Sequence, residues 1–502
     1  MAASTSIKCT CRVCIEIRGR IDKIFCILDI YGWILDSYIV DFFQDNLWEK
    51  LPESWRHVLQ DTSPQEFGKW LSGDICCTRV WPLSLLALRR AINVLQINRD
   101  HKDSDSILSC VRSKETKHEK IIESSKRESD DTRNTLNSNF QYDKFHNLFS
   151  KHIKKKKRYE IQEIAQICVD CTCKSNTKCI VDIGSGMGHL ARVLAFQYGL
   201  YVTCIEQDCM LLEQARKCDT ELLLSVQKHL PNFSKKGPQH VVAKLESSDP
   251  VNTDLIEQLR ELFETNFSLS NAEATFGLVG LHPCGDLAST LLKLYTSRNE
   301  AKFISIVGCC YMKLTLESER KELMGYPLSE YLMSFKNPKL SYTALEVACH
   351  AIEKYCDKLK TGDYKDLIVH AYRAALETIL LKKSEKLRHS QVKNVKVTKD
   401  MTFEQYCAAA TSHLPANLQP QNFDINTTEI NNFLRSWQQV IIFGSLRTML
   451  APLVETIVLF DRFLYLSEKD LVPTLKPVFD ARQSPRNFVL ISMKDNIQQI
   501  DS

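Results

Sequence analysis

The sequence has no long apolar segment that is free of charge. The nearest candidate is residues 440–466, which contains Arg447, Glu455, Asp461 and Arg462. A charged side chain at the centre of a membrane span costs about 2.5–3.5 kcal/mol. We therefore expect a buried pair of helices here and no membrane span. The first residues, Met-Ala-Ala-Ser, also lack the basic and apolar regions of a signal peptide.

The chain lacks the cysteine spacing of a disulfide scaffold, although it has 20 cysteines in 502 residues. Some are directly adjacent, as in Cys76-Cys77 and Cys309-Cys310, and charged residues separate others. Together with the missing signal peptide, this usage is typical of a reducing compartment, so we predict a cytoplasmic or nuclear protein. The formal net charge of +4 permits a polyanionic partner without requiring one.

Zinc-finger spacing is missing as well. Two cysteine clusters could hold a metal: Cys9-x-Cys11-x-x-Cys14, and the group formed by Cys168, Cys171, Cys173 and Cys179. Neither has a matching histidine set or a second C-x-x-C at finger spacing. The sequence therefore predicts no metal site.

The most informative segment is a glycine-rich turn. An apolar run ends at Asp182, three glycines follow at alternate positions (Gly184, Gly186 and Gly188), and apolar residues at helical spacing begin at Leu190. This predicts a strand, a tight turn and a helix start, which is how nucleotide-type cofactors are held in α/β sheets. The free N–H groups of the helix start favour such a ligand.

The glycine spacing distinguishes between two cofactors. Dinucleotide sites usually show G-x-G-x-x-G, whereas this chain has G-x-G-x-G preceded by Asp182, which is typical of S-adenosylmethionine (SAM) loops in class I methyltransferases. Glu206 ends the next apolar run, 18 residues after Gly188, where its carboxylate can accept both ribose hydroxyls. A dinucleotide, or a turn without a ligand, remains the alternative. The predicted SAM-binding residues are Asp182, Gly184, Ser185, Gly186, Gly188 and Glu206.

Two polar loops follow later strands. Because ligands bind beyond the carboxyl ends of strands in a doubly wound sheet, these loops are expected to face the methyl acceptor. The candidate acceptor-side residues are His282, Cys284 and Asp286 in the first loop, and Cys309 and Tyr311 in the second. If the acceptor must lose a proton, His282 and Asp286 are the candidate general bases.

The thiols in these loops allow three interpretations. His282, Cys284, Cys309 and Cys310 have the ligand types of a zinc site, but not its usual spacing. Pro283-Cys284 resembles the nucleophile of cytosine-5 methyltransferases, but no accompanying acidic motif is present. We favour the third interpretation, in which the cysteines are small buried groups that let the loops approach the cofactor and substrate.

No Asn-Pro-Pro-Tyr or Asp-Pro-Pro-Tyr loop follows the fourth strand, which argues against adenine N6 methylation.

Alternating strands and helices between residues 179 and 315 predict an α/β fold with a mainly parallel sheet. The predicted strands are residues 179–183, 201–205, 241–243, 275–281 and 303–307, with a terminal pair at 473–478 and 487–493. The predicted domains are a helical N-terminal domain (1–98), a charged disordered linker (99–139), a SAM-binding core (140–340), a helical insertion (341–470) and a strand pair that completes the core sheet (471–502).

The run Lys154-Lys155-Lys156-Lys157-Arg158 precedes the core. Such a run is usually a solvated helix face or a nuclear-import signal, and phosphate binding is the alternative. We therefore treat RNA as a possible partner through this run and the helical regions, and expect no DNA partner.

The chain resembles the methyltransferase-like protein 25 family, most closely the branch 25B that is also labelled ribosomal RNA adenine dimethylase domain-containing. The resemblance rests on residues 51–55, 156–160, 182–190, 280–287, 308–313, 348–351, 372–378, 451–456 and 484–487. It implies a class I (Rossmann-like) SAM-dependent sheet with a helical N-terminal extension and a helical insertion. The family's motifs do not define the acceptor, and a similarity of the two thiol loops to a tRNA 2′-O-methyltransferase group favours RNA over protein or a small molecule. The alternative function is a non-catalytic scaffold that binds RNA or protein.

Overall fold

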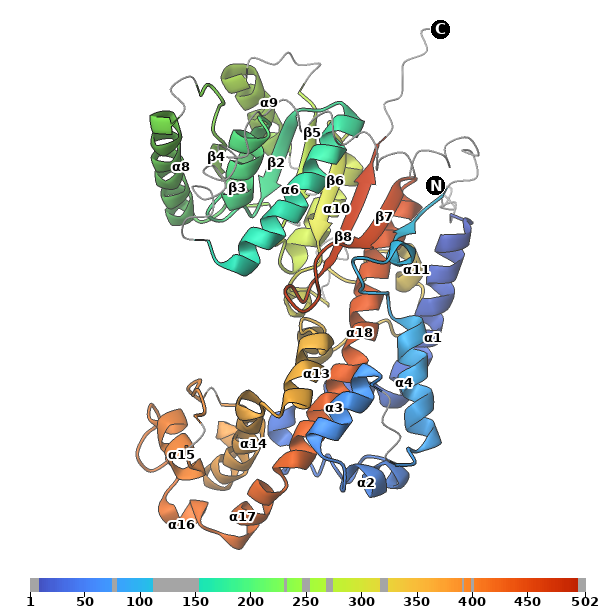
Figure 1. The fold of residues 1–502 in the computed structure, drawn as a ribbon, viewed down its shortest axis with the longest axis vertical. Coiled ribbons are helices and arrows are strands. Elements are labelled where there is room, and N and C mark those ends of the chain that lie inside the picture. Colours follow the sequence, from blue (N-terminus) through green and yellow to red (C-terminus); the bar gives the residue numbers. More distant parts are fainter. Residues whose placement is uncertain are drawn as a thin grey trace. The chain divides into compact units, whose positions relative to one another are not determined.

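The chain forms a mixed β-sheet with helices on both faces, together with a group of helices (Figure 1). The computed structural model describes residues 9–74, 79–111, 153–229, 233–245, 253–267, 274–316, 324–390, 392–398 and 401–494. Two compact units can be separated. We call Met1–Ile21, Asn98–Lys339 and Ile457–Ser502 the sheet unit, and Asp22–Ile97 and Leu340–Thr456 the helical unit.

Eight strands build the sheet, in the order β1-β7-β8-β6-β5-β2-β3-β4. They are β1 (Leu108–Ser109), β2 (Cys179–Ile183), β3 (Tyr201–Glu206), β4 (Gln239–Val242), β5 (Phe276–Gly280), β6 (Ala301–Val307), β7 (Val472–Pro477) and β8 (Phe488–Met493). Strands β2 to β6 are parallel to one another, whereas β8 runs antiparallel to both β6 and β7. Every predicted strand is present, shifted by at most a few residues.

Helices cover the sheet because its central strands are apolar on both sides. All residues of β2 and β5 are buried, as expected for parallel strands between two helical layers. The helices of the sheet unit are α6 (Lys155–Ser175), α7 (His189–Arg192), α8 (Cys209–His229), α9 (Thr253–Phe267), α10 (Asp286–Ser297) and α11 (Glu330–Met333). It also contains the short 3₁₀ helices η2 (Ser104–Ser106) and η7 (Tyr311–Lys313) and the short π-helix η5 (Val193–Gln197).

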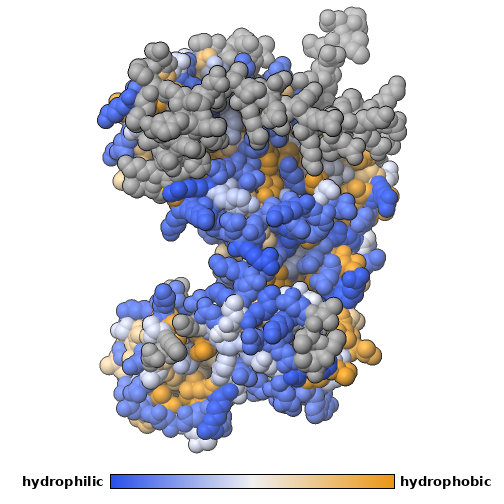
Figure 2. Space-filling view, viewed as in Figure 1, coloured by the Kyte–Doolittle hydropathy of each residue, from blue (hydrophilic) through white to orange (hydrophobic). Residues whose placement is uncertain are grey.

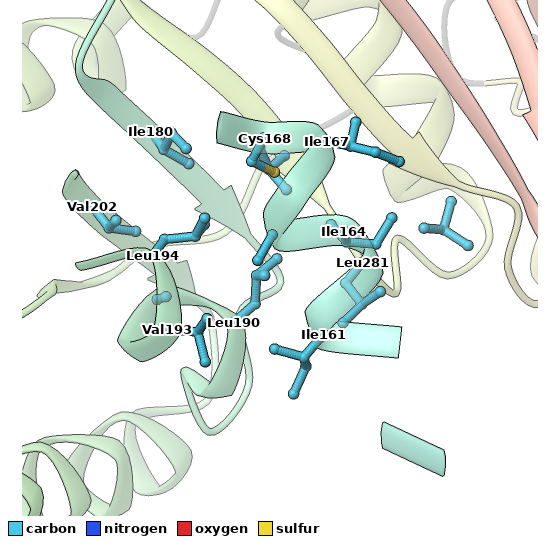
Figure 3. Close-up of a cluster of buried hydrophobic side chains, with 14 of the residues drawn as sticks. Ile161, Ile164, Ile167, Cys168, Ile180, Leu190, Val193, Leu194, Val202 and Leu281 are labelled. Atoms are coloured by element: carbon cyan, nitrogen blue, oxygen red, sulfur yellow. The ribbon is translucent and has the colours of Figure 1, made fainter. Parts of the chain in front are cut away.

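One helical layer joins α6 to the glycine-loop segment. Ile164 and Cys168 of α6 pack with Leu190 and Leu194, which follow the loop, and with Ile180 of β2 (Figure 3). Alternate residues of a strand share a face, so Asp182 lies on the same side of β2 as Ile180, toward α6. This core therefore fixes the position of the turn that follows β2.

The helical unit has hydrophobic clusters of its own, one of them around Phe403, Tyr406 and Leu376. Its elements are η1 (Ile39–Asp41), α2 (Glu53–Leu59), α3 (Pro64–Ser72), α4 (Leu83–Leu95), α12 (Tyr342–Val347), α13 (Ile352–Thr361), α14 (Lys365–Lys383), η9 (Glu385–Leu387), α15 (Phe403–Thr411), α16 (Asn422–Ile425) and α17 (Thr428–Arg435). Two helices contribute residues to both units: α1 (Arg12–Asp36) and α18 (Trp437–Glu468).

The predicted helix pair at 440–466 is wrong, because α18 is a single helix of 32 residues that contains Pro452. By length and composition α18 is the one helix among the described residues that could cross a membrane, but its apolar window is entirely buried inside the protein. Core helices of soluble proteins have the same composition.

Figure 2 shows a mainly hydrophilic surface on the visible described residues, with hydrophobic side chains in small groups.

Part of the predicted linker also belongs to the fold. Residues 99–111 include β1, in which Leu108 pairs with Leu475 of β7, and the Cys110 N–H donates to the Pro473 carbonyl at 2.9 Å. These backbone hydrogen bonds attach the segment to the sheet edge. The rest of the predicted linker, 112–139, and Cys76-Cys77 lie outside the described residues.

Candidate functional site

The glycine loop joins the carboxyl end of β2 to α7. Its three glycines all have positive φ, +72° at Gly184, +55° at Gly186 and +68° at Gly188, a backbone region that residues with a Cβ rarely adopt. At Gly184 a Cβ would also lie 2.9 Å from Cδ2 of Leu287, in the first turn of α10. Glycine is therefore required for the loop conformation and for its close approach to this helix.

Glu206 lies beside this loop, at the carboxyl end of the adjacent strand β3. Its Oε2 accepts a hydrogen bond from the Gly186 N–H at 3.0 Å. Its Oε1 accepts from the N–H groups of Gln207 and Asp208 at 2.9 and 3.2 Å. The side chain is only half-buried, so a carboxylate in a fixed orientation remains accessible next to the loop.

Asp182 is the second-last residue of β2, just before the glycines, and is 3% exposed. Its pKa is raised to about 7, mainly by burial and also by the negative charge of Glu206, while Lys157 of α6 acts in the opposite direction.

The basic run at 154–158 is not uniform in its exposure. Lys154, Lys155 and Lys156 are exposed, whereas Lys157 is half-buried near Asp182, and burial lowers the pKa of its ammonium group.

A polar network supports the loop from behind. Arg192 of α7 donates to the Met187 carbonyl and to Asp219 of α8, and the Asp219 carboxylate also contacts His240 Nε2 at 2.5 Å. His189 lies 3.0 Å from Arg192 through its Nδ1, and burial lowers the pKa of its imidazole to about 4. No sequence motif predicts this network, because its residues come from three separate elements, α7, α8 and β4.

The two thiol loops meet at the carboxyl ends of β5 and β6. The Sγ atoms of Cys284 and Cys309 are 3.5 Å apart, and those of Cys309 and Cys310 are 3.6 Å apart. His282 Nδ1 lies 3.9 Å from Cys309 Sγ. The three sulfur atoms fall within 4.8 Å of one another, but three thiols alone do not complete a tetrahedral zinc site.

Hydrogen bonding makes two of these thiols unequal. The contact with Cys309 lowers the pKa of Cys284, and the same contact together with burial raises the pKa of Cys309 to about 12. Cys284 is half-buried, whereas Cys309 is buried. Cys284 is therefore the thiol of the pair that ionises first.

Two predicted acceptor-side residues have structural contacts instead. The carboxylate of Asp286 accepts from the backbone N–H and the hydroxyl of Thr315 at 2.8 and 2.5 Å, which leaves it poorly placed to act as a base. Tyr311 is fully buried, and the guanidinium of Arg462 lies 5.8 Å from the centre of its ring. Both side chains hold the loops through these contacts.

His282 faces the carboxylate of Glu160, which is not among the predicted site residues. Its Nε2 lies 3.6 Å from Oε2 of Glu160, a buried carboxylate on α6. Oε1 of Glu160 accepts from the Ser484 hydroxyl at 2.6 Å. Residues 156–160, 280–287 and 484–487 all carry the family resemblance, and their shared occurrence was the only sequence signal for this contact.

Arg462 of α18 was likewise missed. Its side chain is 2% exposed, and its Nε and Nη2 atoms have no hydrogen-bond partner among the described residues. Burial lowers the pKa of the guanidinium, while Tyr311, Asp461 and Cys309 act in the opposite direction. A cation therefore lies beneath the second thiol loop.

The central part of the chain matches a known family. Residues 156–317 match the family described as "Methyltransferase domain". The chain is 30% identical over 231 residues to "Probable methyltransferase-like protein 25" of Mus musculus, a match that covers 43% of this chain and 37% of that protein. The Homo sapiens protein of the same name is 29% identical over 232 residues, covering 43% and 36%. The matches thus span little more than a third of these relatives' length.

A solved structure is also similar. It is the crystal structure of magnesium protoporphyrin IX methyltransferase from Synechocystis with bound SAH, at 13% identity, covering 36% of this chain and 68% of that chain with a TM-score of 0.19. The domain match and the strand order confirm the predicted class I methyltransferase fold. The curated relatives confirm the predicted resemblance to the methyltransferase-like protein 25 family, without distinguishing its 25B branch.

Proposed function

We propose that this chain is a SAM-dependent methyltransferase. The observation that carries the proposal is the contact between Glu206 and the glycine loop, because a half-buried carboxylate at the end of β3 is held next to three glycines with positive φ. This is the arrangement that an adenosine-containing ligand needs: a carboxylate for the ribose hydroxyls and a backbone without Cβ atoms beside it.

The residues present fit this cofactor. Glu206 would accept hydrogen bonds from the ribose, and Gly184, Gly186 and Gly188 would border the methionine part. Asp182 lies behind the loop on the α6 side, near Lys157. When bound, SAM supplies a sulfonium methyl group that a nucleophile can displace in line. Arg192 and Asp219 hold the loop in place, so the chain contributes mainly orientation.

His282 is the proposed general base for an acceptor that must lose a proton. Glu160 faces its Nε2 and orients the ring, a role that carboxylates often have beside catalytic imidazoles. His282 lies in the loop between β5 and α10, and Leu287 in the first turn of α10 lies against Gly184 of the glycine loop. The acceptor atom would therefore approach from the side of the thiol loops.

RNA is the proposed acceptor class. Three exposed lysines, Lys154, Lys155 and Lys156, lie immediately before Lys157, whose charge interacts with Asp182 beside the glycine loop. A basic stretch at this position would hold a phosphate backbone close to the proposed methyl donor.

Calorimetric titration with SAM tests the cofactor. Replacing Glu206 by Gln removes the charge that accepts from the ribose, so we expect the Kd for SAM to rise about 10- to 100-fold, the value of a hydrogen bond to a charged group. Glu213→Gln is the matched control, because Glu213 is an exposed carboxylate on α8, and it should bind SAM like the parent. If the parent does not bind SAM, the chain is a scaffold with a methyltransferase fold.

Labelled SAM tests the acceptor. Incubation with total RNA and with a protein extract should label the RNA, and mass spectrometry of the nucleosides identifies the modified atom. A variant that carries both Lys154→Glu and Lys155→Glu should label RNA less while it binds SAM normally. Lys156 is left unchanged in it, because its Nζ lies 3.6 Å from Oε1 of Glu160. Label found only in protein would exclude RNA as the acceptor.

A further inference from the structure

Four cysteines from distant parts of the sheet unit converge at one point. Cys9 and Cys11 lie just before α1, Cys14 lies in its first turn, and Cys110 follows β1, 96 residues after Cys14. Their Sγ atoms all lie within 4.8 Å of one another. The sequence contains no fourth ligand near the first three, so only the fold completes the set.

The spacing of the sulfur atoms matches a tetrahedral metal site. Cys110 Sγ lies 3.6 Å from that of Cys9, and 3.8 Å from those of Cys11 and Cys14. Four sulfurs arranged tetrahedrally around zinc at about 2.3 Å are about 3.8 Å apart. A disulfide requires about 2.05 Å between sulfurs, so none of these pairs is bonded.

The surroundings are also those of a structural zinc site. The Cys14 N–H points at Cys11 Sγ at 3.4 Å, as expected when a thiolate takes the capping position of a helix. Arg18 donates to the Cys9 carbonyl at 2.7 Å, placing a cation beside the cluster. Cys14 and Cys110 are buried and the other two are half-buried. Because a tetrahedral zinc ion takes four ligands, these four thiolates would leave no open coordination position.

We propose that Cys9, Cys11, Cys14 and Cys110 bind one structural zinc ion, which fastens the start of α1 to the segment that follows edge strand β1. The anchor on the other side already exists, since the Cys110 backbone donates to Pro473 of β7. A tetrahedral Cys₄ set of this kind supplies folding free energy directly. It is independent of SAM, because neither its ligands nor Pro473 belongs to the glycine loop.

Metal analysis of the full chain, purified under reducing conditions without chelator, tests the proposal. We expect one zinc per chain, and X-ray absorption should show four sulfur ligands at about 2.3 Å. Cys14→Ser and Cys110→Ser should each abolish stoichiometric zinc. Cys173→Ser and Cys26→Ser remove exposed cysteines on α6 and α1 and should retain it.

A second measurement covers the possibility that the ligand variants do not fold. In the zinc-loaded parent, Cys9, Cys11, Cys14 and Cys110 should resist alkylation and become labelled together once a chelator removes the metal. The proposal is overturned if the parent neither contains nor takes up zinc, if zinc persists in both ligand variants, or if these cysteines form disulfides. SAM titration of the same samples shows separately whether the proposed activity stands.

Discussion

Asp182 is a buried carboxyl whose charge state should control stability. Its pKa is raised from 3.8 to about 7, so the folded state binds this proton more tightly than the unfolded state, and the contribution of Asp182 to stability falls as the pH rises from about 4 to about 7. Asp182→Asn removes this dependence. The stability of the variant relative to the parent should increase by on the order of 3 kcal/mol between pH 5 and pH 8.

Urea unfolding at several pH values measures this difference. The control is Asp170→Asn, which changes an exposed carboxylate on α6 and should leave the difference flat. A constant difference between Asp182→Asn and the parent from pH 5 to pH 8 would show that the Asp182 carboxyl titrates as it does in the unfolded chain.

Cys284 should be the more reactive thiol of its pair, because the contact with Cys309 lowers its pKa. Cys309→Ala removes this contact and should slow alkylation of Cys284 near pH 7 by about tenfold, the lower value of a hydrogen bond to a charged group. Cys309→Ser keeps a donor and should react almost like the parent. Peptide mass spectrometry follows the rate, with exposed Cys173 as internal reference. Equal rates in both variants would show that the Cys309 side chain does not control the ionisation of Cys284.

At the scale of elements, the contact between α3 and α13 depends on one glycine. A Cβ on Gly68 would lie 2.5 Å from Cβ of Leu359 and 3.3 Å from the backbone nitrogen of Lys360. Gly68→Ala should therefore destabilise the chain by about 1–3 kcal/mol, because two helix backbones must separate. In Gly32→Ala, on α1, the nearest atom is at 3.8 Å. This control should be neutral, or stabilising by up to about 1 kcal/mol, in thermal unfolding. Equal destabilisation by both variants would contradict the assignment of the effect to the contact between α3 and α13.

The elements that sequence patterns identified are those with local signals. Strand β2 is an apolar run that ends in a glycine turn, and its predicted bounds agree with the structure. Helix α18 was wrongly predicted as a pair of helices, and that prediction rested on the charged residues within its apolar run, such as Asp461. In the structure Asp461 accepts from the N–H groups of Leu328 and Ser329, both at 2.8 Å, partners 132 or more positions away that no local pattern reveals.

The site residues also fall into two groups, those that a local sequence signal predicts and those that only the fold brings together. Glu206 and the glycines follow from spacing, because each lies next to a strand end that the sequence marks. The partners Glu160 and Cys110 come from separate segments, and their roles depend on which elements the sheet brings together. Cys110 lies in a stretch that composition assigned to a linker, although its backbone is bonded to β7.

At the scale of the whole molecule, the two units have separate cores, one around Ile180 and Ile164 and another around Phe403 and Tyr406. The proposed SAM residues all belong to the sheet unit. A ligand that binds only the folded state stabilises by RT ln(1 + [L]/Kd), about 2.7 kcal/mol at 100 times Kd. Saturating SAM should therefore slow hydrogen exchange in β2 and β3, while α14 and α15 exchange at unchanged rates.

Hydrogen exchange with mass spectrometry, compared with and without SAM, resolves these elements. Glu206→Gln at the same SAM concentration supplies the control, because its weaker binding should reduce the protection of β2 and β3 without changing the baseline. Equal slowing in α14, α15 and the two strands would mean that the units unfold as one cooperative body. Protection confined to α14 and α15 would place the ligand in the helical unit and remove Glu206 from the ribose role. Local protection at the glycine loop, lost in Glu206→Gln, is the result that joins the proposed function to the fold.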